Sequence, residues 1–229
     1  MTIQESHNQE GVSKLTKLLS SKETTQVVKA MGKLFPDAKA ELNHDNAFQL
    51  LIAVILSAQT TDTAVNKVTT KLFEAYPQPE DLKEADQADI EDKIKTIGLY
   101  RNKAKFIKQC ASDIVDKFDG QVPSNRKDLE SLAGVGRKTA NVVMSVAFEE
   151  PAIAVDTHVN RIAKKFHIAA EDDSIAQVEK RLNDKLPKDL WSQAHHWMIF
   201  FGRYQCPARK HDHEECVRKV YDIIEKEKL

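Results

Sequence analysis

Residues 129–140 read LESLAGVGRKTA, and this stretch decides the fold that the sequence predicts. We expect a short helix over about 126–132 and a second helix from about Arg137, joined by a turn that contains two glycines. Gly134 and Gly136 allow the backbone to turn with positive φ and to approach another molecule closely. The first N–H groups of the second helix would then point outward with the positive end of its dipole, which suits a phosphate. An ordinary helical hairpin with a glycine cap remains the plainer interpretation.

Apolar residues recur at helical spacing on both sides of this hairpin. The nearly unbroken apolar run Phe48–Ala58 is typical of a buried core helix and is far short of the ~20 residues that span a bilayer. Gly98 follows an apolar stripe and suits a left-handed helix cap. Residues 152–155 form an extended crossing too short to seed a sheet. Only 7 glycines and 7 prolines in 229 residues leave few turns for a many-stranded β protein, so we expect an all-α fold.

Charge and cysteine content narrow the class of protein further. Lys and Arg number 34 against 35 Asp and Glu, so the net charge of -1 provides no global positive field, and any nucleic-acid surface must be local. Three cysteines cannot all pair within the chain, and the start MTIQESHNQE lacks the features of a secretory signal. We therefore expect a cytoplasmic protein with no membrane segment.

The segment 129–140 resembles the helix-hairpin-helix DNA-binding motif. Further blocks resemble, in order and spacing, the endonuclease III family of DNA glycosylases: LLIAVILSAQTTD (50–62), IGLYRNKA (97–104), LAGVGRKTANVV (132–143), AVDTHVNR (154–161) and HHWMIFFGRYQC (195–206). The resemblance implies two helical domains with DNA bound in a cleft between them. We expect one domain over 40–150, with the hairpin at about 126–148, and a second made of 1–39 with 151–229.

The resemblance also implies the chemistry. Lys138 matches the amine that attacks the sugar C1′, expels the damaged base and forms a Schiff base, which leads to β-elimination of the 3′ phosphate. The helix dipole and Arg137 would lower the pKa of Lys138 and so favour the neutral nucleophile. Asp156 matches the carboxylate that accepts a proton and stabilises positive charge on the sugar. The plainer interpretations are a solvated or phosphate-contacting lysine and a helix N-cap.

Such an enzyme must flip its target nucleotide out of the duplex, which costs a few kcal/mol. Gln59 and Leu99 match the residues that the family inserts into the gap, although core packing could explain Leu99 and a helix cap could explain Gln59. The other expected DNA contacts come from the hairpin and from the VDTH block: Gly134, Val135, Gly136, Arg137, Thr139 and His158. A local positive face would come from basic residues after Leu99, of which the more distal could be merely solvated: Arg101, Lys103, Lys105 and Lys108.

The C-terminal loop, residues 206–222, departs from the family pattern. Most members hold a [4Fe-4S] cluster with four cysteines spaced C-x6-C-x2-C-x5-C. Here those positions are Cys206, His213, Cys216 and Asp222. We expect no iron-sulfur cluster and no cofactor, with hydrogen bonds and packing by the final helix closing the loop. A Cys2His2 zinc site can also be drawn from Cys206, His211, His213 and Cys216, against the simpler interpretation of surface histidines.

The leading hypothesis is a monomeric base-excision repair enzyme, a bifunctional glycosylase and AP lyase that acts on oxidised pyrimidines in duplex DNA. Its DNA partner would carry a damaged or abasic nucleotide. A glycosylase for pyrimidine dimers or mismatched thymine would use the same catalytic pair, since selectivity lies in the pocket walls. A non-catalytic protein that binds damaged DNA is the alternative from another class, and the presence of both Lys138 and Asp156 speaks against it.

Overall fold

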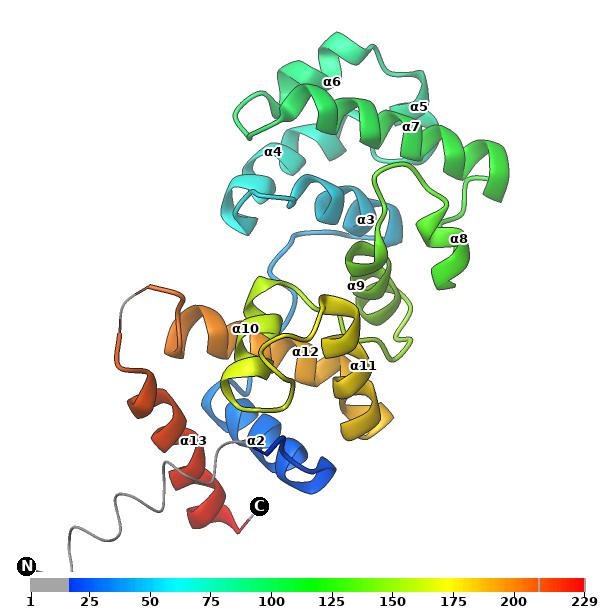
Figure 1. Ribbon diagram of the computed structural model, residues 1–229. Coiled ribbons are helices and arrows are strands. Elements are labelled where there is room, and N and C mark those ends of the chain that lie inside the picture. Colours follow the sequence, from blue (N-terminus) through cyan, green and yellow to red (C-terminus); the bar gives the residue numbers. More distant parts are fainter. Residues whose placement is uncertain (1–16, 210, 229) are drawn as a thin grey trace, which may run out of the picture. The chain divides into compact units, whose positions relative to one another are not determined.

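The computed structural model describes residues 17–209 and 211–228, and every regular element in these ranges is a helix (Figure 1). In chain order they are α2 (Ser21–Leu34), α3 (Ala47–Leu56), α4 (Asp62–Ala75), α5 (Pro79–Glu84), α6 (Gln87–Ile94), α7 (Tyr100–Phe118), α8 (Arg126–Glu130), α9 (Arg137–Ala147), α10 (Thr157–Lys165), α11 (Ile175–Lys185), η1 (Lys188–Leu190), α12 (Trp191–Phe200), the π-helix η2 (Phe201–Gln205) and α13 (His213–Glu227). The all-α prediction is confirmed. None of the described helices is both long and apolar enough to cross a membrane.

The described residues divide into two compact units. Ala40–Ala152 forms one unit, which contains α3 to α9; the residues before Ala40 join those from Ile153 onward in the other, which contains α2 and α10 to α13. Each unit has its own cluster of buried apolar side chains. Residues 152–155, where the chain passes from one unit to the other, have no regular secondary structure.

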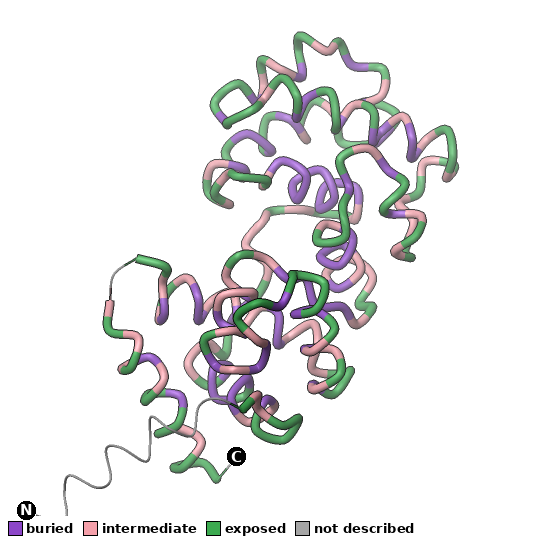
Figure 2. The backbone as a smooth tube through the Cα atoms, in the orientation of Figure 1, coloured by how far each residue is buried: buried purple, intermediate pink, exposed green. Residues whose placement is uncertain are grey.

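The helix α3 is the centre of the Ala40–Ala152 unit. All of its side chains from Phe48 to Leu56 are buried, and Figure 2 shows the helix in the colour of buried residues. It packs against α4, α7 and α9. Apart from Gln49 the helix is apolar on every side, and such a helix requires a buried position, because any exposed face would leave apolar surface in water. The helix α9, which follows the two-glycine turn, is therefore seated directly on the core.

Eight of the described α-helices begin with a polar side chain that accepts a backbone N–H of the first turn. These N-caps are Ser20, Asn46, Thr61, Asp86, Asn125, Asp156, Ser174 and Asp212. Such a cap stabilises a helix by about 1 kcal/mol. The starts of α7 and α9 have no side-chain cap; nor has that of α12, which continues from η1. Leu99 at the start of α7 and Gly136 at the start of α9 are among the predicted DNA contacts.

The left-handed conformation expected at Gly98 occurs one residue later. Gly98 does not have a positive φ, whereas Leu99, the N-cap of α7, has φ 60° and ψ 25°. The prediction for Gly98 is wrong because α6 already ends at Ile94, so Gly98 does not directly follow a helix end. A leucine in this region of backbone space is strained, since its Cβ crowds the carbonyl oxygen that follows.

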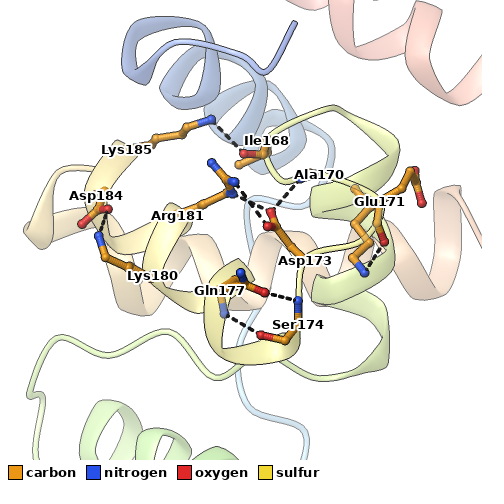
Figure 3. Close-up of polar contacts among 11 residues, drawn as sticks. Ile168, Ala170, Glu171, Asp173, Ser174, Gln177, Lys180, Arg181, Asp184 and Lys185 are labelled. Atoms are coloured by element: carbon orange, nitrogen blue, oxygen red, sulfur yellow. Dashed lines mark hydrogen bonds and ion pairs between the residues drawn. The ribbon is translucent and has the colours of Figure 1, made fainter. Parts of the chain in front are cut away.

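A network of polar contacts fixes the connection between α10 and α11 (Figure 3). Asp173 is buried, accepts two hydrogen bonds from the guanidinium of Arg181 and accepts a third from the amide of Ala170. The Arg181 guanidinium and then the Ala170 amide hold the pKa of Asp173 below its usual value, against the opposing effect of burial. Ser174 and Gln177 cap the start of α11 reciprocally. The connection is therefore rigid although it has no regular structure.

We predict that Asp173→Asn destabilises the protein by about 1–3 kcal/mol at pH 7, because the buried acceptors lose their charge-assisted bonds. The folded-state pKa of Asp173 is lowered, so its stabilising effect is full above about pH 4 and is lost as the pH falls through the folded pKa. Urea unfolding between pH 3 and pH 7 measures both effects.

The matched control for this change is Asp184→Asn. Asp184 is exposed and pairs with Lys180 one turn away on the same helix (Figure 3), so the expected change is below about 0.5 kcal/mol. An equal loss of stability in the two variants would show that the Asp173 network does not fix the connection.

Candidate active site

The two-glycine turn joins α8 to α9, and its inner side is part of the core. Leu129, Leu132 and Val135 are at most 8% exposed. The Arg126 Nε atom donates to the Asn141 side chain over 3.1 Å and so joins the two helices. Because the Val135 side chain is used for packing, only its backbone remains for the DNA contact predicted at this residue.

The two glycines have different roles. Gly134 has φ 77°, and a Cβ atom there would lie 3.1 Å from the Phe106 Cβ and 3.4 Å from the Ile55 Cγ2, so the turn itself requires glycine. Gly136 has an ordinary extended conformation, with φ -102° and ψ 179°. A Cβ atom at Gly136 would meet no described atom within 4 Å. The bare backbone at Gly136 is therefore open to a ligand. Packing within the described chain does not require a glycine at this position.

The start of α9 has the features of an anion-binding site. Gly136 is the N-cap and offers no side chain, and the first turn contains no acidic residue. The first N–H groups of a helix have no partner within it, and the positive end of the helix dipole lies at the same place. Arg137 and Lys138 are exposed there, and Thr139 is half-buried. This arrangement suits a phosphate group.

Asp113 on α7 anchors the hairpin, a role that the sequence did not reveal. Its carboxylate accepts the Ala133 amide over 3.1 Å and pairs with Lys117 over 2.9 Å. Burial would raise the pKa of Asp113, but the hydrogen bonds from Lys117, the Ala133 amide and Gln109 hold it below its usual value. The turn is thus fixed by a charge-assisted bond as well as by apolar packing.

Gln59 and Leu99 share an unusual backbone conformation. Their φ angles are 55° and 60°, and both side chains are exposed, Leu99 by 61%. Core packing therefore does not explain Leu99, and helix capping does not explain Gln59, since Thr61 caps α4. Exposed side chains on strained backbone are typical of residues held for binding.

A buried lysine connects the segments that carry these two residues. Lys103 is 4% exposed, and its Nζ atom donates to the Thr60 Oγ1 over 2.6 Å, next to Gln59. Its backbone amide donates to the Leu99 carbonyl over 3.0 Å. Burial lowers the pKa of Lys103. No spacing rule pairs Thr60 with Lys103, so only the structure reveals this connection.

The predicted positive face is smaller than the sequence suggests. Lys103 is buried, and the Nζ atom of Lys108 donates to the Ala85 carbonyl over 2.6 Å. Both lysines are therefore used inside their own unit. Arg101 and Lys105 are exposed, and Arg101 forms a long ion pair with Glu91 over 3.8 Å, so these two residues are what remains of the positive face.

The VDTH block places Asp156 at the start of α10. Its Oδ1 atom accepts the Val159 amide over 2.8 Å, so Asp156 is the N-cap of that helix. The cap uses one carboxylate oxygen and leaves the other for a further partner. The Nδ1 atom of His158 is buried, and no hydrogen bond to it occurs within the described ranges. The His158 residue as a whole is half-buried, so part of the side chain remains exposed.

The loop between η2 and α13 gathers metal-binding side chains. The ligand atoms of Cys206, His211 and Cys216 all lie within 4.8 Å of one another, and the His213 Nδ1 lies 3.5 Å from the Cys206 Sγ. Both cysteines are buried, and burial together with Cys216 raises the pKa of Cys206 to about 12. Arg161 fixes this part of the backbone by donating to the Cys206 carbonyl over 2.6 Å.

Comparison with known proteins identifies the family. Residues 52–188 match the model of the HhH-GPD superfamily base excision DNA repair protein. The chain is 49% identical over 199 residues to Endonuclease III of Bacillus subtilis (strain 168), covering 87% of this chain and 91% of that protein. It is 43% identical over 195 residues to Endonuclease III of Escherichia coli (strain K12), covering 85% and 91%.

The chain belongs to the endonuclease III family. A trapped covalent Endonuclease III–DNA intermediate has a TM-score of 0.82 to it at 51% identity, covering 85% of this chain and 92% of that one. A non-covalent Endonuclease III–DNA complex has a TM-score of 0.83 at 47% identity, covering 91% and 100%. The protein is therefore a base-excision repair enzyme, a DNA glycosylase and AP lyase that acts on damaged or abasic duplex DNA.

The prediction of a chain without a cofactor is wrong. Endonuclease III proteins normally carry a [4Fe-4S] cluster, and this member of the family gathers Cys206, His211 and Cys216 into a group that could hold a metal. The physical reason is that the fold of the loop brings His211, a histidine that the cysteine spacing does not include, beside the two thiols. The donors present are thiols and imidazoles, whereas a cubane cluster is held by four thiolates.

For this endonuclease III-family enzyme we predict that Gly136→Ala lowers affinity for abasic duplex DNA at least about tenfold without loss of stability. The added methyl group would meet no described atom of the chain, but it would stand where a DNA backbone must approach. Fluorescence anisotropy with a labelled duplex and thermal unfolding measure the two quantities.

Gly134→Ala provides the contrast. The left-handed φ and the 3.1 Å contact with Phe106 should destabilise that variant by about 1 kcal/mol or more. If Gly136→Ala bound DNA with wild-type affinity, close approach at this glycine would be excluded.

Proposed function

We propose that this enzyme removes oxidised or ring-saturated pyrimidines and cleaves the strand 3′ to the abasic site through a Schiff base on Lys138. The observation that carries the proposal is the position of Lys138, exposed in the first turn of α9 beside the bare backbone of Gly136. A phosphate bound at that helix start would bring a sugar next to the amine. In support, one relative is described as a trapped covalent intermediate of Endonuclease III with DNA, and such an intermediate requires a nucleophile.

The reaction divides into two steps with one covalent intermediate. The neutral Lys138 amine forms a bond to the sugar C1′ as the bond to the base breaks, and the base takes up a proton. Ring opening gives a protonated Schiff base, which makes the C2′ proton acidic. Loss of that proton expels the 3′ phosphate, and hydrolysis of the Schiff base frees the amine. The positive helix end and Arg137 favour the neutral amine.

Asp156 would act as the carboxylate of the same reaction. We assign it to accept the proton of the attacking amine and to stabilise positive charge on the sugar ring. The second oxygen of Asp156, which the helix cap does not use, provides the acceptor. One side chain thus caps α10 and takes part in the reaction.

Leu99 and Gln59 would fill the space that the flipped nucleotide leaves. Both are exposed on left-handed backbone, and Lys103 connects their segments through Thr60 and the Leu99 carbonyl. Apolar contact of Leu99 with the neighbouring bases would recover part of the unstacking cost. His158, Arg137 and Thr139 would contact the DNA backbone.

The cytoplasm is the compartment we propose for this enzyme. The three cysteines are free and buried, as expected where thiols stay reduced.

Lys138→Gln should abolish the covalent adduct that borohydride traps on abasic DNA and should abolish strand cleavage, because an amide nitrogen cannot form a Schiff base. Duplexes carrying an abasic site, thymine glycol, a pyrimidine dimer or a T:G mismatch test the chemistry and the substrate class together. Affinity for abasic DNA should remain within about tenfold of wild type, since Gly136 and the helix start are unchanged.

Lys127→Gln on α8 is the matched control, because Lys127 is an exposed lysine of the same hairpin. It should keep the full yield of adduct. An undiminished adduct in Lys138→Gln would remove Lys138 from its proposed role, and preference for the dimer or the T:G duplex would overturn the proposed substrate class.

Asp156→Asn should lower the rate of base excision by about 10²-fold or more while leaving the thermal stability nearly unchanged. Asparagine caps helices as well as aspartate does, so the change removes the negative charge and keeps the cap. Single-turnover kinetics on a thymine glycol duplex and thermal unfolding measure the two effects. A wild-type rate in this variant would leave Asp156 with the role of a helix cap alone.

A further inference from the structure

The loop between η2 and α13 carries a set of side chains that the proposed reaction does not use. Cys206 directly follows η2, His213 begins α13, and Cys216 lies in the first turn of that helix. The two cysteines are 0% and 1% exposed. Free cysteines are often buried, so burial alone does not indicate a metal. The two imidazoles beside these thiols do point to one, because zinc binds Cys and His together, and the structure assigns these cysteines no disulfide.

The spacing of the donor atoms fits a tetrahedral ion. With Zn–S bonds of about 2.3 Å and Zn–N bonds of about 2.0–2.1 Å, neighbouring donors lie roughly 3.4–3.8 Å apart. The distance between the Cys206 Sγ and the His213 Nδ1 is 3.5 Å. The donors of Cys206, His211 and Cys216 lie within 4.8 Å of one another, so a contraction of about an ångström brings these three to the spacing of zinc ligands. The rings of His211 and His213 are adjacent, with centroids 4.0 Å apart.

His211 supplies an independent observation. Its Nδ1 atom lies 2.7 Å from the Arg209 carbonyl, and since a carbonyl only accepts, Nδ1 carries the proton. The Nε2 atom then bears the lone pair, and it is buried without a hydrogen-bond partner among the described residues. An unsatisfied buried nitrogen is costly. A histidine whose other ring nitrogen donates to a backbone carbonyl is the usual form of a metal ligand.

We propose that Cys206, His211, His213 and Cys216 bind one thiophilic divalent cation of the zinc type as a structural site. Two thiols lose their protons and form metal–sulfur bonds, while the two imidazoles donate their lone pairs, so binding releases two protons. The four ligands close the coordination shell and leave no position for a substrate. The ion joins η2 to α13, and Asp222, exposed further along α13, takes no part.

The test uses the whole chain without a tag. Elemental analysis should find about one zinc and no stoichiometric iron per chain. A strong chelator should remove the zinc and lower the melting temperature, and zinc should restore it. Cobalt added to the metal-free protein should give the intense visible bands of tetrahedral Co²⁺ with thiolate ligands.

Ligand variants separate metal binding from misfolding. His211→Gln and His213→Gln leave the buried thiols in place, and each should weaken zinc binding more than roughly 100-fold, since even second-shell changes cost 10–100-fold. His44→Gln is the matched control, because its Nδ1 contacts the carbonyl two residues back, at Leu42, as that of His211 does at Arg209. Cys110→Ser controls for the third buried cysteine.

About four irons per chain, or no bound metal after zinc is supplied, would overturn the proposal. Unchanged zinc content in both histidine variants would overturn the ligand set. Borohydride trapping is a separate measurement, so loss of the adduct with zinc retained would contradict the proposed reaction and leave the metal site standing.

Discussion

The backbone at the start of α9 is the constraint on which the candidate site depends. A helix start normally takes a side-chain cap, as most of the longer helices here do, yet Gly136 provides none. The uncapped N–H groups must find another partner or remain in water. Core packing of α9 on α3 holds this end in place, and the bond from the Ala133 amide to Asp113 holds the turn before it. An anionic ligand therefore meets donors that are already oriented.

The same logic applies to α7, whose start also lacks a side-chain cap. Leu99 begins α7 in a left-handed conformation that costs a leucine free energy, and no side chain caps the helix. The buried ammonium of Lys103 spans from this segment to Thr60 beside Gln59. The left-handed backbone at Leu99 and Gln59 lowers the stability of the fold, while the surrounding contacts hold both residues in place. Such strain is useful when the ligand is a duplex that must be unstacked.

The C-terminal loop follows a different principle. Its two thiols are buried, two imidazoles lie close to them, and one imidazole nitrogen is buried without a hydrogen-bond partner among the described residues. At the start of α9 the exposed groups are positive and no side chain caps the helix, which suits a phosphate. In the loop the groups are buried electron-pair donors, which suits a cation. The charge and burial of these groups therefore distinguish the two kinds of partner.

The sequence by itself determined the all-α fold, the core position of α3 and the hairpin, because helical periodicity, a paucity of glycine and proline, and the GVG turn are local signals. The ordered motifs likewise determined the family, since five blocks at the right spacing rarely arise by chance. Only the tertiary structure decided which glycine is strained, which lysines are buried and which histidine joins the cysteines. A left-handed conformation was expected at Gly98 but occurs at Leu99. Lys103 was expected on the surface, but its side chain is buried and donates a hydrogen bond to Thr60. These outcomes depend on contacts between residues distant in the chain, and the spacing of residues along one helix carries no information about them.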